Sequence, residues 1–386
     1  MDTNLAIFSL RGLSTHVSRC LGYEFEDLLC SALPGTKLYA PRLNPSIQTG
    51  LKIKARVAQT GSFGGVFDNV LAIERMDEHE VLLAVIGGVP DLALLGAMKD
   101  WRRKSRYAIC RLDELDVDDF PRLRRRLRVL EQFDLVYCSE HYTAEKLREE
   151  LKNPEVMYLP PGVDTLGLAP VLEPSSRPID VTNLGSIADA THKGLLEYAK
   201  QIDGFYFYDT LKGRYEARSP SEHRLRYANT LKRSRYFACY FAKMRREGPP
   251  GQLEFGPRYS EGLAAGCVLL GSWKSTPAFE KYFGWEDAVI EMPFDCPNPS
   301  GILRLLDSQA DRLREISIQN VRRALEGHDH VHLWSAVVDR LGLSEAYHMS
   351  RRQEEVARKL NEFGYPTRHV AERRHQDPND GSADPA

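Results

Sequence analysis

The stretch Gly256-Pro257-Arg258-Tyr259-Ser260-Glu261-Gly262-Leu263-Ala264-Ala265-Gly266-Cys267-Val268-Leu269-Leu270-Gly271-Ser272 decides the fold of this chain. Pro257 suits the first turn of a helix, Gly266 suits the position just after a helix end, and an apolar, strand-like run follows at once. Glu261 is therefore expected near the start of a short helix, where backbone N–H groups face outward and anions bind. A carboxylate beside such a helix end suits a nucleotide, because the acid can hold ribose hydroxyls while the N–H groups hold phosphate.

Short apolar strands alternate with helical segments along most of the chain. In the first half we expect strands at 4–10, 81–86, 107–112 and 135–139, and helices at 15–31, 91–99, 120–133 and 143–151. After the Pro-rich break at 159–164 we expect strands at 179–184, 205–208, 236–241 and 288–292, and helices at 193–201, 227–233, 299–325 and 330–341. This alternation predicts an α/β fold with two Rossmann-like domains, each a parallel sheet covered by helices on both faces.

The Pro-rich break sets the expected domain boundaries. We assign 1–165 to an N-terminal domain and 166–342 to a C-terminal domain. A further helix, expected within 343–372, returns across the cleft to the N-terminal domain, and the tail at 373–386 is rich in polar residues and is expected to be disordered. Ligands of such open sheets bind beyond the carboxyl ends of the strands, and here also in the cleft between the domains.

The composition limits the partners, the metal sites and the cellular compartment that we expect for this protein. The 386 residues carry a formal net charge of −2, so the sequence predicts no nucleic acid partner. Seven scattered cysteines without a Cys-x-x-Cys pair argue against a disulfide framework or a structural zinc and favour a reducing cytoplasm. We expect no signal peptide, and no apolar run approaches the ~20 residues that a membrane-spanning helix needs.

Two further features point to an anion site in the second domain. Gly185-Ser186 follows its first strand, and Lys193 lies near the start of the next helix, so this turn can cradle a diphosphate. An ordinary turn and a solvated lysine are the alternative explanation. Arg258 offers a planar fork for phosphate oxygens, and it lies on a later strand-to-helix junction of the same sheet.

The residues around Glu261 complete the expected donor site. Gly262 belongs to a run of small residues that leaves room for the close approach of a ligand or another backbone. Ser260 precedes Glu261, and we include both Ser260 and Gly262 among the binding residues. The alternative is that Glu261 only complements the helix dipole.

Together these features resemble a known family, the GT-B glycosyltransferases of the group 1 or family 4-like type. The run from Arg258 to Ser272 is similar to that family's C-terminal domain. Other segments agree in order: 133–143 resembles the last strand and helix start of its N-terminal domain, 159–164 its linker, 185–194 its phosphate turn, and 328–341 its late C-terminal helix. The resemblance covers roughly residues 130 to 342.

The resemblance implies transfer of a sugar from a UDP-, GDP- or dTDP-sugar to an acceptor that the sequence does not identify. The donor is expected on the C-terminal domain and the acceptor on the N-terminal domain. Glu261 matches the ribose-binding acid, Lys193 a phosphate-binding base, and Arg258 a donor-side position. The family implies no cofactor and no divalent metal.

One position departs from the family pattern. Family members often carry a second acid eight positions before the first, where this chain has Leu253. Glu254 is therefore our candidate for the sugar-side acid. A retaining reaction can use the leaving diphosphate as base, whereas an inverting one needs a general base, for which His16 is the best-placed candidate. Helix capping or packing is the alternative role for His16.

Three other runs carry weaker signals. The Gly-rich run at 60–65 can shape an acceptor loop or form a hairpin, and it lacks the residues of a P-loop. The acidic run at 113–119 contains an Asp-x-Asp spacing that can hold a divalent ion, but capping of the next helix is the stronger interpretation. The arginines of 120–133 favour a solvated face over contact with an acidic membrane surface or an anionic acceptor.

Two other functions stay open from the sequence. One is a sugar-nucleotide epimerase or hydrolase on the same fold. The other is a non-catalytic module that binds a nucleotide sugar, which the missing acid at Leu253 would allow.

Overall fold

The computed structural model describes residues 3–43, 71–170, 176–185, 187–209, 216–241 and 252–363. Within these ranges the N-terminal part forms a six-stranded parallel sheet. In spatial order its strands are β2 (Lys37–Tyr39), β1 (Leu5–Phe8), β5 (His79–Gly88), β6 (Ser105–Glu114), β7 (Leu135–Cys138) and β8 (Glu155–Tyr158). Two short strands between β2 and β5 in the sequence, β3 (Arg42–Leu43) and β4 (Leu71–Ala72), form a separate antiparallel pair.

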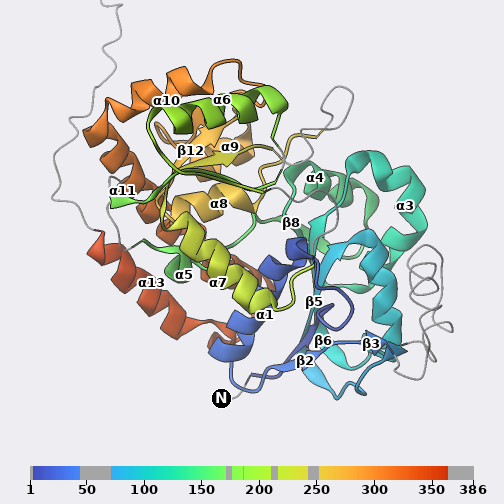
Figure 1. Cartoon of the computed structure of the whole chain (residues 1–386). Helices are drawn as coiled ribbons and strands as arrows, with labels where there is room; N and C mark the ends of the chain where they lie inside the picture. The colour runs from blue at the N-terminus through green and yellow to red at the C-terminus, as the bar shows by residue number, and fades with distance from the viewer. Residues whose placement is uncertain are drawn as a thin grey trace, which may run out of the picture.

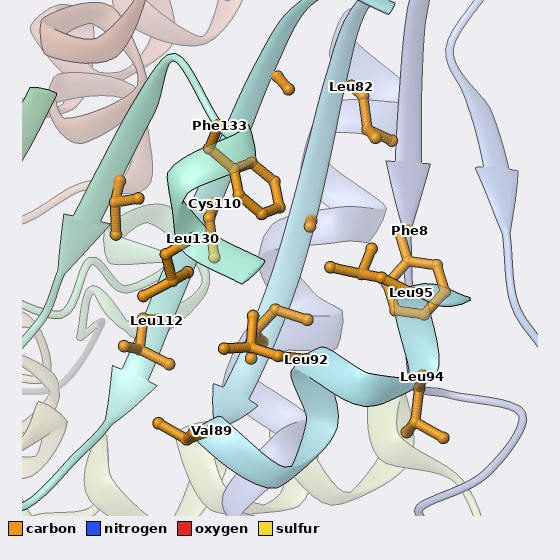
Figure 2. Close-up of a cluster of buried hydrophobic side chains, with 14 of the residues drawn as sticks. Phe8, Leu82, Val89, Leu92, Leu94, Leu95, Cys110, Leu112, Leu130 and Phe133 are labelled. Atoms are coloured by element: carbon orange, nitrogen blue, oxygen red, sulfur yellow. The ribbon is translucent and has the colours of Figure 1, made fainter. Parts of the chain in front are cut away.

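Helical segments connect these strands. They are η1 (Val17–Arg19), α1 (Cys20–Ala32), η2 (Val89–Ala97), η3 (Val117–Asp119), α3 (Phe120–Leu127), η4 (Arg128–Gln132) and α4 (His141–Glu150), where η marks a 3₁₀ helix. The central strand β5 is apolar at successive positions, so it fills a core on each face of the sheet. Figure 2 shows one of these cores, with Leu92 and Leu95 of η2 and Leu130 of η4 packed over side chains of β1, β5 and β6.

The second sheet is also parallel, and five strands of it fall within the described residues. Its spatial order is β10 (Tyr206–Tyr208), β9 (Ile179–Asn183), β11 (Ser234–Cys239), β12 (Val268–Gly271) and β13 (Ile290–Glu291). The helices of this part are α5 (Thr165–Leu168), α6 (Asp189–Gln201), α7 (Pro220–Leu231), α8 (Pro257–Ala264), α9 (Pro277–Phe283), α10 (Pro299–Asp307) and α11 (Ala310–Gly327).

The chain then returns to the first domain through α12 (His330–Leu341), η6 (Glu345–Tyr347) and α13 (Ser350–Glu362). Trp334 of α12 and Val356 of α13 are buried in the same cluster as Leu5 and Phe25 of the N-terminal domain. Figure 1 shows α13, in red, below the second domain and beside the first. The predicted return of the C-terminal helix is therefore confirmed, and α12 takes part in it as well.

The chain passes between the domains twice, first through the linker at Val163 and later at His328–His330, and these two segments are hydrogen-bonded to each other. Val163 of the linker donates to the carbonyl of His328, and His330 donates back to Val163, at 3.0 and 3.2 Å. The buried Asp329 carboxylate accepts hydrogen bonds from Thr165 and from Arg352 of α13. These bonds join the linker, the second crossing and the final helix at one point.

The predicted architecture of two parallel α/β domains is confirmed, and the differences lie in the elements. The helix expected at 227–233 begins at Pro220, the segment at 91–99 forms a 3₁₀ helix, and 299–325 is two helices that break near Ser308. The short strands β2 and β8 were not expected. The Gly-rich run at 60–65 and the tail at 373–386 lie outside the described residues, and the exact domain boundaries stay predictions.

Within the described ranges, no helix combines the length and the apolar character that crossing a membrane requires.

Candidate functional site

The candidate site lies where the strand order of the second sheet reverses. After β9 the chain goes to β10 on one side and later returns to β11 on the other side of β9. The carboxyl ends of two strands that flank such a reversal form a crevice, which is where open α/β sheets bind ligands. Gly185 follows β9, and α8 begins beyond β11.

Gly185 and Arg258 meet at this crevice. Gly185 has a φ of +98°, a conformation that favours glycine. A Cβ atom placed on Gly185 would lie 2.1 Å from Nη2 of Arg258, so the guanidinium lies directly against the glycine backbone. The sequence prediction that these two residues share one edge of the sheet agrees with this contact.

Arg258 is the cation best placed to receive an anion here. It is half-buried, and it makes no ion pair with any residue that the structure describes. Arg258 is also the second residue of α8, in the first turn, where backbone N–H groups have no partner within the helix. The arrangement suits a phosphate or diphosphate group.

Glu261 lies one turn further along α8 and is almost fully buried, with 3% of its surface exposed. Its Oε1 accepts a hydrogen bond from Nη1 of Arg224 at 2.5 Å, and its Oε2 accepts one from the Tyr227 hydroxyl at 2.7 Å. Both donors belong to α7. The predicted ribose acid is therefore held by two side chains that the sequence prediction did not include.

Arg224 also joins the two domains. Its Nε donates to Oε2 of Glu24, on α1 of the N-terminal domain, at 2.8 Å. The two helices lie side by side where the domains meet (Figure 1). The guanidinium thus lies between one carboxylate of each domain.

Within this cluster the surroundings favour the ionised forms of Glu24 and Arg224 and the neutral forms of Tyr227 and His330. Burial acts to raise the pKa of Glu24, but the His330 hydrogen bond and the Arg224 charge outweigh it and hold this pKa at about 2. His330 lies 3.5 Å from Glu24, but burial lowers the pKa of His330 and favours its neutral form. The permanent positive charge next to Glu24 is therefore that of Arg224. Burial and then the Glu261 charge raise the pKa of Tyr227 well above its ordinary value, so its hydroxyl stays a donor.

Glu254 has a structural role that the sequence did not suggest. Its carboxylate accepts hydrogen bonds from the backbone N–H groups of His141 and Tyr142, both at 2.9 Å, and so caps the start of α4 in the N-terminal domain. Gln252 supports it from a neighbouring position at 3.2 Å. Burial raises the pKa of Glu254 to about 7, against the pull of these hydrogen bonds. The structure thus gives this carboxylate a contact between the domains, and its role as the sugar-side acid stays a prediction.

The Ser260 side chain and the Cα of Gly262 face the protein interior, so only their backbone groups are left to contact a ligand, and their assignment as binding residues stays a prediction. The Ser260 hydroxyl lies 2.9 Å from Nδ1 of His328, whose Nε2 donates to the carbonyl of Tyr282. Burial lowers the pKa of His328 to about 4, so Nδ1 is free to accept from Ser260. A Cβ atom on Gly262 would lie 2.4 Å from the Leu269 side chain, so this glycine serves close packing of α8 on the sheet.

The remaining predicted residues are less closely joined to the crevice. Lys193 is exposed on α6, and no contact joins it to Gly185, Arg258 or Glu261 in the described structure. Nδ1 of His16 accepts from the Ser18 backbone, as expected for a cap, and its action as a base stays a prediction. Ser186 lies outside the described residues.

The charged runs have structural explanations. Asp116 caps η3 by accepting from Asp118, and Asp113 pairs with Arg111 at 2.8 Å. Among the described residues, no group of three or more His, Cys, Asp or Glu side chains is arranged to hold a metal ion. On α3, Arg122 pairs with the nearby Asp119 and its side chain is 74% exposed, as expected for a solvated face.

A pocket of about 410 Å³ lies on the boundary between α1, α5 and α7. Glu24 and Arg224 line it, together with apolar side chains that include Leu28, Leu168 and Leu225. The ion pair between the domains is therefore reached by solvent on this side.

No family model and no curated protein sequence matches the chain. Solved structures do match. An alpha-glucosyltransferase in complex with UDP-glucose and DNA containing an abasic site has a TM-score of 0.50 and 11% identity, over 88% of this chain and 99% of that one. An alpha-glucosyltransferase with UDP and a 13-mer DNA gives 0.50 and 12%, with the same coverage. Anabaena HepE with UDP and glucose gives 0.48 and 12%, over 88% of this chain and 99% of that one.

At these identities the likeness establishes the fold. The chain has the GT-B fold, with two Rossmann-like domains, as the family resemblance implied. The expectation that excluded nucleic acid is corrected, because two of the similar structures contain DNA. A net charge near zero does not exclude such a partner, since charge on one face can be balanced elsewhere.

Proposed function

We propose that this protein is a glycosyltransferase that moves a sugar from a nucleotide-sugar donor to an acceptor. The observation that carries the proposal is the contact of Arg258 with the backbone of Gly185 at the strand reversal, with Glu261 one turn away on α8. A cation without an acidic partner in the described part of the chain, a glycine turn and a carboxylate, in this order, match a diphosphate followed by a ribose.

The roles follow from the chemistry of each group. Glu261 accepts hydrogen bonds from the ribose hydroxyls, and Arg258 with the first turn of α8 holds the diphosphate. We expect Lys193 to add positive charge nearby without direct contact. Because Glu261 is 3% exposed, the two domains move apart while the nucleotide enters, and they close again once it is bound, which restores the contact of Arg224 with Glu24.

We further propose that the reaction needs no divalent metal. Arg258 can neutralise the charge that develops on the departing diphosphate, and it is not spent on an ion pair within the described part of the chain. Activity is then expected to survive EDTA. Loss of turnover on chelation, restored by Mg²⁺ or Mn²⁺, would contradict this.

The acceptor is expected on the N-terminal domain. Two similar structures were solved with DNA, so DNA belongs in any acceptor screen alongside sugars. All seven cysteines are free thiols, six of them buried, which supports our proposal of a reducing, cytoplasmic setting.

Nucleotide binding is tested by a thermal-shift panel of UDP, GDP, dTDP and ADP. A ligand that binds the native state raises its melting temperature, so at least one diphosphate is expected to do so. The Glu261→Gln variant keeps the side-chain volume but loses the charge, and we expect a clearly smaller shift. Glu280→Gln, on the exposed side of α9, is the matched control and should shift like the wild type. An unchanged shift in Glu261→Gln would contradict the ribose assignment.

Turnover separates the proposal from its rivals. A transferase should release nucleoside diphosphate rapidly only when an acceptor is present. Rapid release without any acceptor would indicate a sugar-nucleotide epimerase or hydrolase instead. Nucleotide binding without turnover, across sugar and DNA acceptors, would indicate a non-catalytic binding module.

A further inference from the structure

Two side chains of α7 donate hydrogen bonds to the Glu261 carboxylate. Arg224 and Tyr227 are three positions apart on this helix, so they lie on one face. The Arg224 guanidinium carbon also lies 5.2 Å from the centre of the Tyr227 ring, which places the two donors next to each other. Each of them bonds a different oxygen of Glu261.

These two bonds leave acceptor capacity on both oxygens. An ionised carboxylate has about four lone-pair directions, two on each oxygen. Arg224 uses one direction on Oε1 and Tyr227 uses one on Oε2. One direction therefore remains on each oxygen, which matches the two neighbouring hydroxyls of a ribose.

The Arg224 side chain is fixed at both ends of its guanidinium. It bonds Glu24 through Nε at 2.8 Å and through Nη2 at 3.2 Å, in addition to Glu261 through Nη1. The side chains of Arg224, Glu24 and Glu261 are 11%, 15% and 4% exposed. A planar fork that is pinned between two carboxylates loses little further freedom when a ligand binds.

We propose that Arg224 and Tyr227 are positioning residues of the donor site, which hold the Glu261 carboxylate in the orientation that receives the ribose hydroxyls. Arg224 is in turn anchored by Glu24, so a residue of the N-terminal domain supports the donor site of the C-terminal domain. This inference rests on the proposed function, because it assigns the ribose to Glu261. It extends the site to residues that make no direct contact with the donor.

The test compares UDP with 2′-deoxy-UDP in calorimetric titrations, or the corresponding pair for whichever diphosphate the panel identifies. The wild type is expected to prefer the ribonucleotide by about tenfold or more, the effect of losing one hydrogen bond to a charged group. In Arg224→Ala this preference should fall to about threefold or less, and Arg224→Lys should restore part of it. Arg226→Ala removes the neighbouring exposed pair with Glu222 and should keep the wild-type preference.

Tyr227→Phe keeps the test decisive if Arg224→Ala does not fold, because it removes one hydroxyl and little volume. It should also reduce the preference, by a smaller factor. A variant that binds both nucleotides more weakly, with the wild-type ratio unchanged, would show a merely structural role and overturn the inference.

The two proposals fail in different ways. If the wild type binds no nucleotide, or does not distinguish ribose from deoxyribose, the ribose assignment of Glu261 itself is wrong. If Glu261→Gln loses the preference while Arg224→Ala and Tyr227→Phe keep it, only the positioning role is wrong.

Discussion

The strand order reverses in the same way in both domains. At each reversal an arginine side chain packs against the backbone of a glycine. In the N-terminal sheet the order β2-β1-β5 repeats the order β10-β9-β11 of the C-terminal sheet. A Cβ atom on Gly87, at the end of β5, would lie 0.8 Å from Nη1 of Arg19, just as one on Gly185 would meet Arg258. The backbone alone thus offers two similar edges.

The difference lies in how each arginine is paired. Arg19 forms an ion pair with the buried Asp91 at 2.7 Å, whereas Arg258 has no acidic partner among the residues described. The protein therefore neutralises the arginine of the N-terminal edge, whereas within the described ranges the arginine of the C-terminal edge keeps its charge uncompensated. The comparison teaches that two edges with the same topology can differ in charge pairing, and our proposal places the diphosphate at the edge whose arginine has no acidic partner among the described residues.

The largest expected effect comes from removing Arg258. Arg258→Ala should weaken UDP binding by about 10- to 100-fold, since a hydrogen bond to a charged group contributes about 1.5–3 kcal/mol. Uridine, which lacks the diphosphate, should bind Arg258→Ala as it binds the wild type. Calorimetric titration of both ligands measures the two effects.

Arg19→Ala is the matched variant at the other edge. It should keep the UDP affinity of the wild type within about threefold, because Arg19 is already occupied by Asp91. Equal losses of UDP affinity in the two arginine variants would break the distinction between the edges.

A smaller effect concerns the contact of Glu254 with the start of α4, which joins the two domains. Glu254 has an ordinary pKa of 4.5 that burial raises to about 7, so the folded protein binds its proton more tightly than the unfolded chain. The free energy of unfolding should therefore fall as the pH rises from about 4.5 to about 7. Glu254→Gln cannot titrate, so relative to this variant the wild type should lose about 1–3 kcal/mol across that range.

Urea unfolding of both proteins at several pH values between 4.5 and 8 measures this difference. Nucleotide affinity at a single pH should change little in Glu254→Gln, because the Glu254 carboxylate is engaged at the start of α4 in the N-terminal domain. Parallel pH profiles of the two proteins would show that the Glu254 carboxyl has no raised pKa.

The smallest expected effect comes from Lys193. Its side chain is exposed, and a solvated cation that acts at a distance contributes about 0–1 kcal/mol. Lys193→Ala should weaken UDP binding by less than about threefold and should lose even this at high salt. A loss as large as that of Arg258→Ala would mean that Lys193 contacts the diphosphate directly.

Local sequence patterns predict much of the fold. The continuous apolar run at 81–86 indicates a buried parallel strand, and β5 is that strand. Pro257 and Gly266 bracket the helix α8 as the sequence suggests. The short strands β2 and β8 are missed, because a few residues of mixed polarity become strands through pairing with a neighbour and carry no period of their own.

The site is predicted less completely than the fold. Gly185, Arg258 and Glu261 each carry a local signal, a turn or a helix start, and lie at or beside the crevice. Arg224, Tyr227 and Glu24 carry none, because their role depends on two helices from different domains meeting in space. Placing the helix start at 227 rather than at Pro220 also hid the shared face of Arg224 and Tyr227.

The small and polar residues near Glu261 show what residue type leaves open. Gly262 and Ser260 have the residue types of a binding loop, but the space at Gly262 is taken by Leu269, and the Ser260 hydroxyl bonds His328. Residue type alone does not distinguish a side that faces a ligand from one that faces the core.

The central claim is that the carboxyl edge of the second sheet holds a nucleotide through Arg258 and Glu261. A crystal structure of the protein with UDP tests it most directly. The ribose hydroxyls should lie about 2.5–3.0 Å from the Glu261 carboxylate oxygens, with the diphosphate against Arg258 and Gly185. UDP bound at another place, such as the Arg19 edge, with Glu261 contacting only protein side chains, would contradict the account.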